Sequence, residues 1–391
     1  MLNTNFPPWP SFTEAEIEAA SAVLRSNAVN YWTGNEGKHF ETEFAEFAGT
    51  DYAIAMSNGT IALEAALAAL GIGAGDEVVV TPRTFLASAS TIVLAGATPV
   101  FADVDADTQN ITAESIERVL TPRTRAIVCV HLAGMPCDMD PINKLATEHD
   151  LRVLEDCAQA HGAHYKDRPV GSLGDIAAWS FCQDKIMTTG GEGGMVTTNS
   201  EALMKAVWSF KDHGKSWEAV FERSHPPGFR WLHEDLGTNG RMTEAQAAIG
   251  RIQLGLMDDW TRKRQRYAEA IWSAAADMPG LRVPAIPDWA GHAAYKCYVF
   301  VEPDELAPGW DRDRIMNSVS EAGVPCFSGS CSEVYLEKAF KSRGLTPIER
   351  LPVARRLGET SLMFLVHPTL EDSHIDQTCE VLSNVMSTAA R

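Results

Sequence analysis

Short apolar runs alternate with helix-like segments through the first half of this chain, and no other sequence feature constrains its fold as strongly. The runs that read as strands are 52–56, 77–81, 99–104, 126–131, 151–155, 176–181 and 194–198. The helix-like segments between them are 61–70, 87–95 and 140–149. This alternation predicts an α/β fold, in which a mostly parallel sheet is covered by helices on both faces.

The pattern changes beyond Thr243. Residues 244–260 are amphipathic, and a long charged helix is predicted to continue to about residue 276. One strand (295–301) and two helices (311–322 and 372–386) are predicted after it. We therefore expect a large domain over residues 1–255 and a smaller C-terminal α+β domain over residues 256–391, joined by the long helix.

Composition narrows the possible partners and location. With 45% hydrophobic and 22% charged residues, the 391-residue chain has ordinary globular usage. A net charge of -19 argues against nucleic acid and anionic membranes as partners, because like charges repel at long range. The eight cysteines are scattered without metal-ligand spacing, and residues 1–10 do not read as a signal peptide. We expect free thiols, no metal site and a cytoplasmic location.

Candidate functional residues follow several predicted strands. They are Ser57-Asn58-Gly59-Thr60, Thr84-Phe85, Asp156 and Ser180. In parallel sheets the ligand binds beyond the carboxyl ends of the strands. This clustering therefore predicts a single site at that edge.

Lys185 lies in the densest of these segments. It follows the apolar run 176–181 and precedes a glycine-rich stretch, Thr188 to Gly194. A lysine amine can form an imine with a carbonyl group, and the glycines permit sharp turns beside a cofactor. A surface lysine before a flexible hairpin would give the same local pattern.

Two further elements change the balance between these readings. Asp156 ends a buried strand, where a carboxylate needs a partner such as a pyridinium N–H, although it can also cap a helix. The Ser57–Thr60 segment opens a helix, where free N–H groups and a hydroxyl bind phosphate, although an ordinary N-cap looks the same. Pyridoxal 5′-phosphate (PLP) needs a phosphate anchor, a carboxylate at its ring nitrogen and an amine at its aldehyde. Together these elements predict a PLP site.

Motifs along nearly the whole chain resemble one known family. In order they are Phe40-Glu41-x-Glu43-Phe44-Ala45, Asn58-Gly59-Thr60, Gly75–Val78, Thr84-Phe85, Glu155-Asp156-x-Ala158-Gln159, Ser180-Phe181, Lys185 with its glycine loop, Asn239–Glu244, Ala247–Leu254 and His367-Pro368-Thr369. The sequence in this respect resembles the DegT/StrS family of sugar aminotransferases. The resemblance implies the type I PLP-transferase fold, with a seven-stranded type of sheet in its large domain.

The resemblance also implies roles for individual residues. Lys185 resembles the lysine that holds PLP as a Schiff base, and Asp156 the partner of the pyridine nitrogen. Gly59, Thr60, Ile61 and Ser180 would hold the phosphate, Phe85 would stack on the ring, and Gln159 would contact its 3′-oxygen side. Asn239 resembles a residue that reaches the phosphate of the neighbouring subunit, which implies a homodimer with shared active sites. Arg241, Trp32 and Ser328 are candidate substrate contacts.

The expected activity is amino transfer from an amino acid, by resemblance L-glutamate, to a keto sugar carried on a nucleotide. Such enzymes act in amino-sugar biosynthesis for polysaccharides, glycans or secondary metabolites. Two departures, Cys182-Gln183-Asp184 before the lysine and Gly240 in place of an aromatic residue, concern the substrate more than the reaction type. The alternatives are a PLP-dependent dehydratase or eliminase and a non-catalytic PLP-binding regulator. A nucleotide-binding dehydrogenase is disfavoured, because Gly-x-Gly-x-x-Gly does not follow the first strand.

Overall fold

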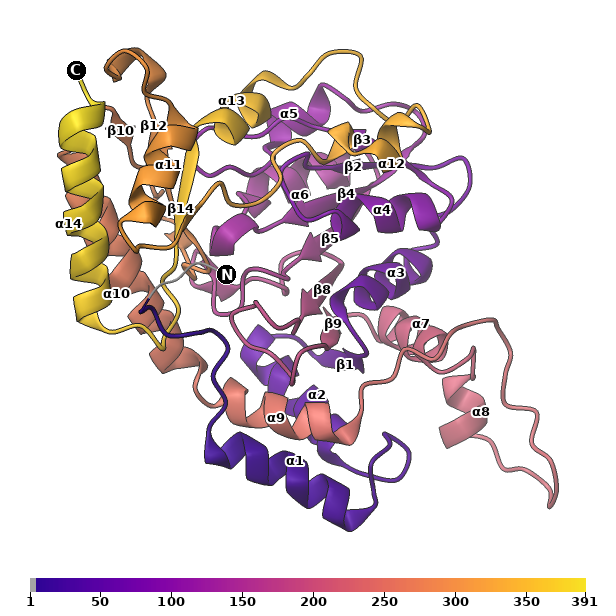
Figure 1. Ribbon diagram of the computed structural model, residues 1–391. Coiled ribbons are helices and arrows are strands. Elements are labelled where there is room, and N and C mark those ends of the chain that lie inside the picture. Colours follow the sequence, from indigo (N-terminus) through magenta and orange to yellow (C-terminus); the bar gives the residue numbers. More distant parts are fainter. Residues whose placement is uncertain (1–4) are drawn as a thin grey trace.

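A seven-stranded sheet forms the centre of the computed structural model, which describes residues 5–391 (Figure 1). Its strands lie in the order β1-β9-β8-β5-β4-β2-β3. Their bounds are β1 (Tyr52–Met56), β2 (Glu77–Val80), β3 (Thr98–Phe101), β4 (Thr124–Val130), β5 (Arg152–Asp156), β8 (Ile176–Ser180) and β9 (Gly194–Thr198). Strands β3, β2, β4, β5 and β8 are parallel, and β9 runs antiparallel to both β8 and β1. The predicted α/β fold with a mostly parallel sheet is confirmed.

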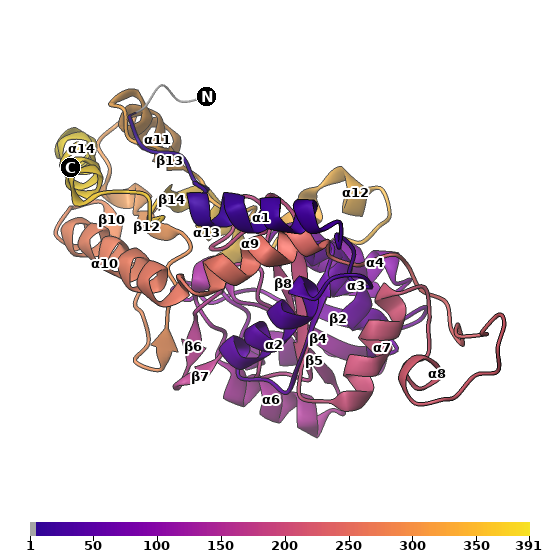
Figure 2. The same ribbon diagram turned by 90° about the horizontal axis from the view of Figure 1, so that it is seen from below.

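Helices cover both faces of this sheet. Their bounds are α1 (Glu14–Ser26), α2 (Glu36–Ala48), α3 (Gly59–Ala69), α4 (Ala87–Leu94), α5 (Ala113–Glu117), α6 (Met139–Glu148), α7 (Glu201–Lys211), α8 (Trp217–Phe221) and α9 (Glu244–Leu254). Helices α2 and α6 contribute to the apolar core on one face, and α3, α4 and α7 to the core on the other. Helices α1 and α9 lie side by side next to α2 (Figure 2).

Each strand contributes alternate side chains to the two apolar cores, because successive side chains of a strand point to opposite faces of the sheet. Val153 of β5 joins the core with α2 and α6, whereas Leu154 joins the core with α3 and α4. The same alternation places Glu155 on the first face and Asp156 on the second. Two adjacent buried acids therefore lie in different environments.

A second, antiparallel sheet of four strands lies towards the C-terminus. Its order is β10-β12-β14-β13, with bounds β10 (Leu281–Arg282), β12 (Cys297–Val301), β13 (Cys326–Phe327) and β14 (Ser361–Phe364). It packs with helices α10 (Met257–Ala276), α11 (Arg312–Glu321) and α14 (Asp372–Ala389) around a third core. The predicted amphipathic segment 244–276 is two helices, since α9 ends at Leu254. The domain boundary at residue 255 stays a prediction.

The remaining elements are short connections. They are β6 (His164–Tyr165), β7 (Arg168–Pro169) and β11 (Ala290–Gly291), which form a three-stranded sheet, α12 (Lys338–Lys341), α13 (Pro352–Thr360), and the 3-10 turns η1 (Leu132–Gly134), η2 (Pro303–Glu305) and η3 (Val334–Leu336). Across residues 5–391, none of the helices combines the length and apolar character needed to cross a bilayer.

An arm formed by residues 212–240 leaves the body after α7 and contains α8 (Figure 1). Its base is closed by a bridge between Asp212 and Asn239 and by a hydrogen bond from the His213 N–H to the Thr238 carbonyl (3.0 Å). Its outer part exposes Phe229 (78%) and Trp231 (83%).

Candidate active site

One cavity of about 680 Å³ opens at the carboxyl ends of β5 and β8 and the start of α3. It is lined by eight of the residues predicted from sequence: Gly59, Thr60, Ile61, Phe85, Asp156, Gln159, Ser180 and Lys185. Because these residues follow the ends of parallel strands, the sequence predicted that they lie together, and the structure places them in this one cavity.

Lys185 is held in an ordered turn rather than a flexible hairpin. Its N–H donates to the Cys182 carbonyl (3.1 Å), and the Thr189 N–H donates to the Phe181 carbonyl (3.2 Å). The Lys185 side chain is 13% exposed, and its Nζ lies 3.5 Å from Asp184 Oδ1. Because Tyr295 donates its hydroxyl hydrogen to Asp184 Oδ2 (2.7 Å), that carboxylate is fixed beside the amine. A largely shielded, oriented amine in the cavity favours the imine-forming interpretation.

Asp156 reaches the same cavity from the end of β5. Its Oδ2 accepts a hydrogen bond from Ser88 Oγ (2.6 Å), and its Oδ1 accepts one from the Ala158 N–H (3.1 Å). Burial raises the pKa of this carboxyl group, while these two hydrogen bonds and the Lys185 charge partly oppose the rise. The carboxylate is therefore short of donors, and a ligand N–H would stabilise its ionised form.

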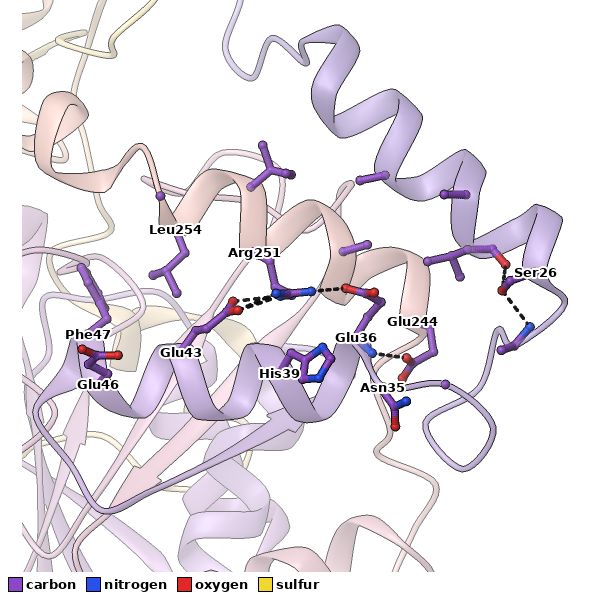
Figure 3. A pocket seen from close by; sticks show the side chains of 18 of the residues that line it. Ser26, Asn35, Glu36, His39, Glu43, Glu46, Phe47, Glu244, Arg251 and Leu254 are labelled. Carbon is purple, nitrogen blue, oxygen red and sulfur yellow. Dashed lines mark hydrogen bonds and ion pairs between the residues drawn. The ribbon is translucent and has the colours of Figure 1, made fainter.

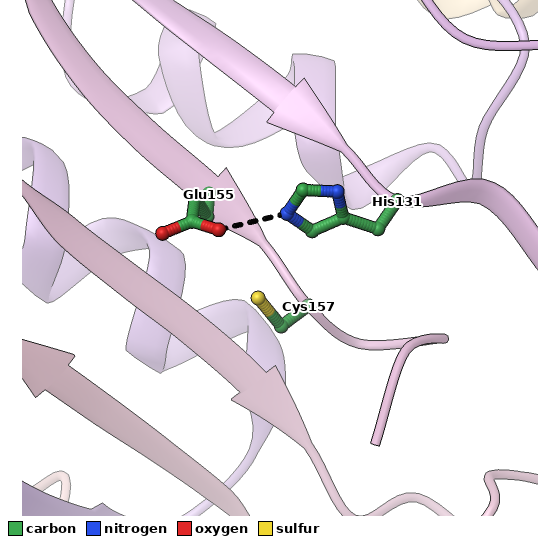
Figure 4. Close-up of side chains that lie close together, drawn as sticks. All are labelled: His131, Glu155 and Cys157. Carbon is green, nitrogen blue, oxygen red and sulfur yellow. Dashed lines mark hydrogen bonds and ion pairs between the residues drawn. The ribbon is translucent and has the colours of Figure 1, made fainter. Parts of the chain in front are cut away.

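Glu155, the preceding residue, has the opposite environment (Figure 4). Its carboxylate accepts from His131 Nε2 (2.9 Å) and from the backbone N–H groups of Gly171, Leu173 and Gly174. Although burial acts to raise its pKa, these donors hold the pKa below its ordinary value. Cys157 lies close by, so these three side chains could in principle bind a metal ion. However, His131 Nδ1 already accepts the Cys137 N–H, and His131 Nε2 donates to Glu155. This cluster consequently has a structural role.

The start of α3 forms the anion-binding part of the cavity. Asn58 caps the helix, since its Oδ1 accepts the Ile61 N–H (2.9 Å). The amides of Gly59 and Thr60 belong to the first turn, where the helix itself provides no acceptor. A Cβ at Gly59 would lie 2.6 Å from the Ser180 Cβ, so only glycine permits this close approach. The turn and the Ser180 hydroxyl together form a cradle suited to a phosphate.

Phe85 and Gln159 complete the cavity. Phe85 is 67% exposed although it is apolar, which suits a ring that a flat ligand covers. Gln159 is buried, and its Oε1 accepts the Ala133 N–H (2.9 Å). This bond orients the amide and leaves its Nε2 hydrogens available as donors.

Four predicted residues do not line the cavity in this chain. Asn239 and Arg241 flank Gly240, whose carbonyl accepts the Ser57 N–H (2.7 Å), and Arg241 pairs with the buried Asp212 (2.7 Å). Trp32 packs against Trp208, and Ser328 is exposed in the loop after β13. Their roles as cofactor or substrate contacts stay predictions.

Sequence reasoning missed Ser88, which orients Asp156. The signal available was its place one helical turn after Thr84, with which its hydroxyl shares a hydrogen bond (2.8 Å). Sequence alone could not show it, because the contact with Asp156 joins residues 68 positions apart. Glu192, which also lines the cavity, was likewise not singled out.

A larger cavity, of about 1090 Å³, lies between α1, α2 and α9 (Figure 3). Its charged side chains bind one another, since Arg251 pairs with Glu36 and Glu43 (both 2.6 Å). Glu244 caps α2 by accepting the N–H groups of Glu36 and Gly37. These contacts tie α2 to α9. Burial raises the pKa of the Glu244 carboxyl group, as it does for Asp156, but none of the described residues that line this cavity is a lysine.

The residues present fit PLP on three structural observations. Gly59 allows the cradle at α3, Asp156 is buried with too few donors, and the Lys185 amine enters the same cavity. These match the phosphate, the pyridine nitrogen and the aldehyde of the cofactor.

Comparisons with known proteins agree with this assignment. The model of the DegT/DnrJ/EryC1/StrS aminotransferase family matches residues 10–383. The chain is similar to GDP-perosamine synthase from Escherichia coli O157:H7, with 43% identity over 66% of this chain and 68% of that one. An aminotransferase structure from Psychrobacter cryohalolentis has a TM-score of 0.96 and 62% identity over 98% of this chain and 99% of that one. The PLP-form of Spr1654, a candidate sugar aminotransferase from Streptococcus pneumoniae, has a TM-score of 0.86 and 26% identity, and the match covers 98% of this chain and 99% of that one.

Proposed function

Because the chain belongs to the DegT/DnrJ/EryC1/StrS aminotransferase family, we propose that it transfers an amino group to a keto sugar with the help of PLP. The amino donor is an amino acid, L-glutamate, and the acceptor sugar is linked to a nucleotide. The product would enter the synthesis of polysaccharides, glycans or secondary metabolites. The observation that carries this proposal is the cavity shared by the Lys185 amine and the donor-poor Asp156 carboxylate.

PLP supplies an aldehyde that takes up the amino group and a ring that accepts electrons from the donor's α-carbon. Lys185 Nζ would hold the aldehyde of the bound cofactor between turnovers. As a free amine, Lys185 Nζ would carry the proton that leaves the donor's α-carbon. Asp184, fixed by Tyr295, orients the lysine in this step.

The other cavity residues orient the cofactor. Asp156 would hold a proton on the pyridine nitrogen, which would make the ring a better electron acceptor. Gly59, Thr60, Ile61 and Ser180 would hold the phosphate, Phe85 would stack on the ring, and Gln159 would contact its 3′-oxygen side. Arg241, Trp32 and Ser328 are proposed to meet substrate.

A homodimer with shared sites is part of the proposal. Asn239 would reach the phosphate in the second subunit, since it lies at the base of an arm whose outer part exposes Phe229 and Trp231. Asn239→Ala and Lys185→Ala proteins should each be poorly active, and mixing them should restore activity through hybrid dimers. No recovery after verified subunit exchange would contradict shared sites.

A cytoplasmic location is proposed as well. All eight cysteines are free thiols, which suits a reducing compartment.

Absorbance spectroscopy tests the function directly. Purified protein supplied with PLP should show a yellow band that L-glutamate bleaches and a keto nucleotide-sugar restores, with an amino sugar formed. GDP- and dTDP-linked keto sugars are the first acceptors to screen. Release of water without amino transfer would instead indicate a dehydratase, and a coloured protein unreactive to any amino acid would indicate a regulator.

A further inference from the structure

We propose that Trp9 is a positioning residue that fixes the backbone of Lys185 and links it to the C-terminal part of the chain. The indole Nε1–H of Trp9 donates to the Lys185 carbonyl oxygen at 2.7 Å. The bond joins residues 176 positions apart, from a segment that precedes α1 to the turn that carries the amine. The catalytic meaning of this contact rests on the proposed function of Lys185, whereas the contact itself does not.

The other side of the Trp9 ring is held by the connecting helix α10. Trp260 meets it edge-on with ring centroids 5.2 Å apart, and the Arg264 guanidinium lies 5.1 Å from its centroid. Arg264 is fully buried, and its Nε and Nη2 have no hydrogen-bond partner among the described residues. An aromatic face is therefore a major source of compensation for this buried cation.

The segment that leads into α14 makes the remaining contacts with Trp9 and its neighbour Pro8. His367 stacks on Trp9 with centroids 5.9 Å apart and planes 23° apart. Thr369 donates its hydroxyl hydrogen to the Pro8 carbonyl (3.0 Å), which holds the strand of chain that carries Trp9. Trp9 thus lies between the Lys185 turn on one side and α10 and residues 367–369 on the other.

This geometry explains how an N-terminal residue can affect the chemistry without touching the reacting atoms. Besides local hydrogen bonds within residues 181–193, the turn at Lys185 is held by the bond from the Thr188 N–H to Gln253 Oε1 (2.8 Å) and by the Tyr295 hydroxyl on Asp184 (2.7 Å). Loss of the indole donor would leave the Lys185 carbonyl free to rotate with the peptide. Because proton transfer depends on the placement of Nζ, small displacements should slow that step more than they weaken substrate binding.

Trp9→Phe tests the inference, because it removes the indole donor and keeps an aromatic ring in the same place. Trp272→Phe is the matched control, since it makes the same ring change and the Trp272 indole donates to the Tyr298 carbonyl (2.9 Å) rather than to the Lys185 turn. In cofactor-free protein, amide hydrogen exchange in residues 182–191 should be about fivefold faster in Trp9→Phe and unchanged in Trp272→Phe. In the PLP-loaded enzyme, the single-turnover rate with the amino donor should fall about tenfold, with the donor KM changed less than twofold.

Thr369→Val gives a second route if Trp9→Phe folds poorly, because it keeps the Trp9 indole and releases the Pro8 anchor together with the hydroxyl contact to His367 Nδ1 (2.8 Å). It should shift exchange in residues 182–191 in the same direction by a smaller factor. Equal exchange in Trp9→Phe and Trp272→Phe would overturn the inference. So would faster exchange with an unchanged single-turnover rate. Neither result would bear on whether Lys185 binds PLP, which borohydride trapping reports separately.

Discussion

The two faces of the sheet at the end of β5 show what separates a structural acid from a functional one. Glu155 and Asp156 are adjacent and both are buried. Glu155 has a histidine and three backbone amides as donors, and its pKa is lowered. Asp156 has two donors, its pKa is raised, and it faces the cavity with Lys185. Incomplete satisfaction beside a lysine in the same cavity, rather than burial alone, distinguishes Asp156 from Glu155.

The first prediction concerns Lys185, which shares the cavity on the Asp156 face of the sheet. Lys185→Ala should lower amino transfer by about 10⁴-fold or more, because the amine is both the anchor and the proton carrier. Steady-state assays with glutamate and a keto sugar measure the loss. Lys296→Ala, which removes a neighbouring lysine near the same Tyr295 ring, is the control and should remain active. Near-normal transfer by Lys185→Ala would remove the basis of the comparison.

The second prediction separates activity from stability. Asp156→Asn should lower activity by about 10²–10³-fold, because a neutral amide cannot keep the pyridine nitrogen protonated. Burial raises the folded-state pKa of Asp156 above its unfolded value near 3.9, so the ionised group destabilises the cofactor-free fold at neutral pH. The variant should therefore be at least as stable at pH 7 in urea titrations, with this advantage disappearing below about pH 3.9. A large loss of apo-protein stability would contradict the assignment.

The third prediction concerns the opposite face. Glu155→Gln should lower the free energy of unfolding by roughly 2–4 kcal/mol at pH 7, because four donors lose a charged acceptor. The pKa of Glu155 is lowered on folding, so its contribution is present above the unfolded value near 4.3 and is lost as pH falls through the folded value. Urea titrations should show the variant and the parent converging in acid. Activity per folded molecule should change less than about fivefold; a loss as great as that of Asp156→Asn would break the comparison.

The fourth prediction, with the smallest expected effect, concerns Ser88, which donates to Asp156. Ser88→Ala removes the hydroxyl that donates to Asp156 Oδ2 and should reduce activity by about five- to tenfold, through one lost hydrogen bond to a charged group. Ser172→Ala is the matched control on the other face, where the Ser172 hydroxyl donates to the Pro169 carbonyl (2.7 Å). Kinetic assays should show it as active as the parent. Equal losses in the two variants would mean that Ser88 has no special relation to Asp156.

The sequence was sufficient for the sheet and for the residues at its strand ends. Period-two and period-3.6 patterns are local, and parallel strands deliver their ends to one edge, so Thr60, Asp156, Ser180 and Lys185 could be grouped without coordinates. Boundaries shifted by a few residues, as where β3 ends at Phe101 rather than at Val104.

Long-range contacts could not be predicted in the same way. Nothing in the local pattern indicates that Ser88 meets Asp156, or that the Trp9 indole meets the Lys185 carbonyl. The faces of β5 follow from alternation. The number of donors around each acid depends on the folded chain, which brings Ser88 to Asp156 and the Gly171, Leu173 and Gly174 amides to Glu155. Satisfaction of buried groups is a property of the tertiary structure.

Borohydride reduction followed by peptide mass spectrometry tests the central claim most directly. PLP-loaded protein should lose its yellow colour on reduction and yield one modified peptide, with the pyridoxyl group on Lys185 Nζ. Lys185→Ala protein treated in the same way should carry no such group. A folded, PLP-supplemented protein in which the label is absent, or lies on another lysine, would contradict the account.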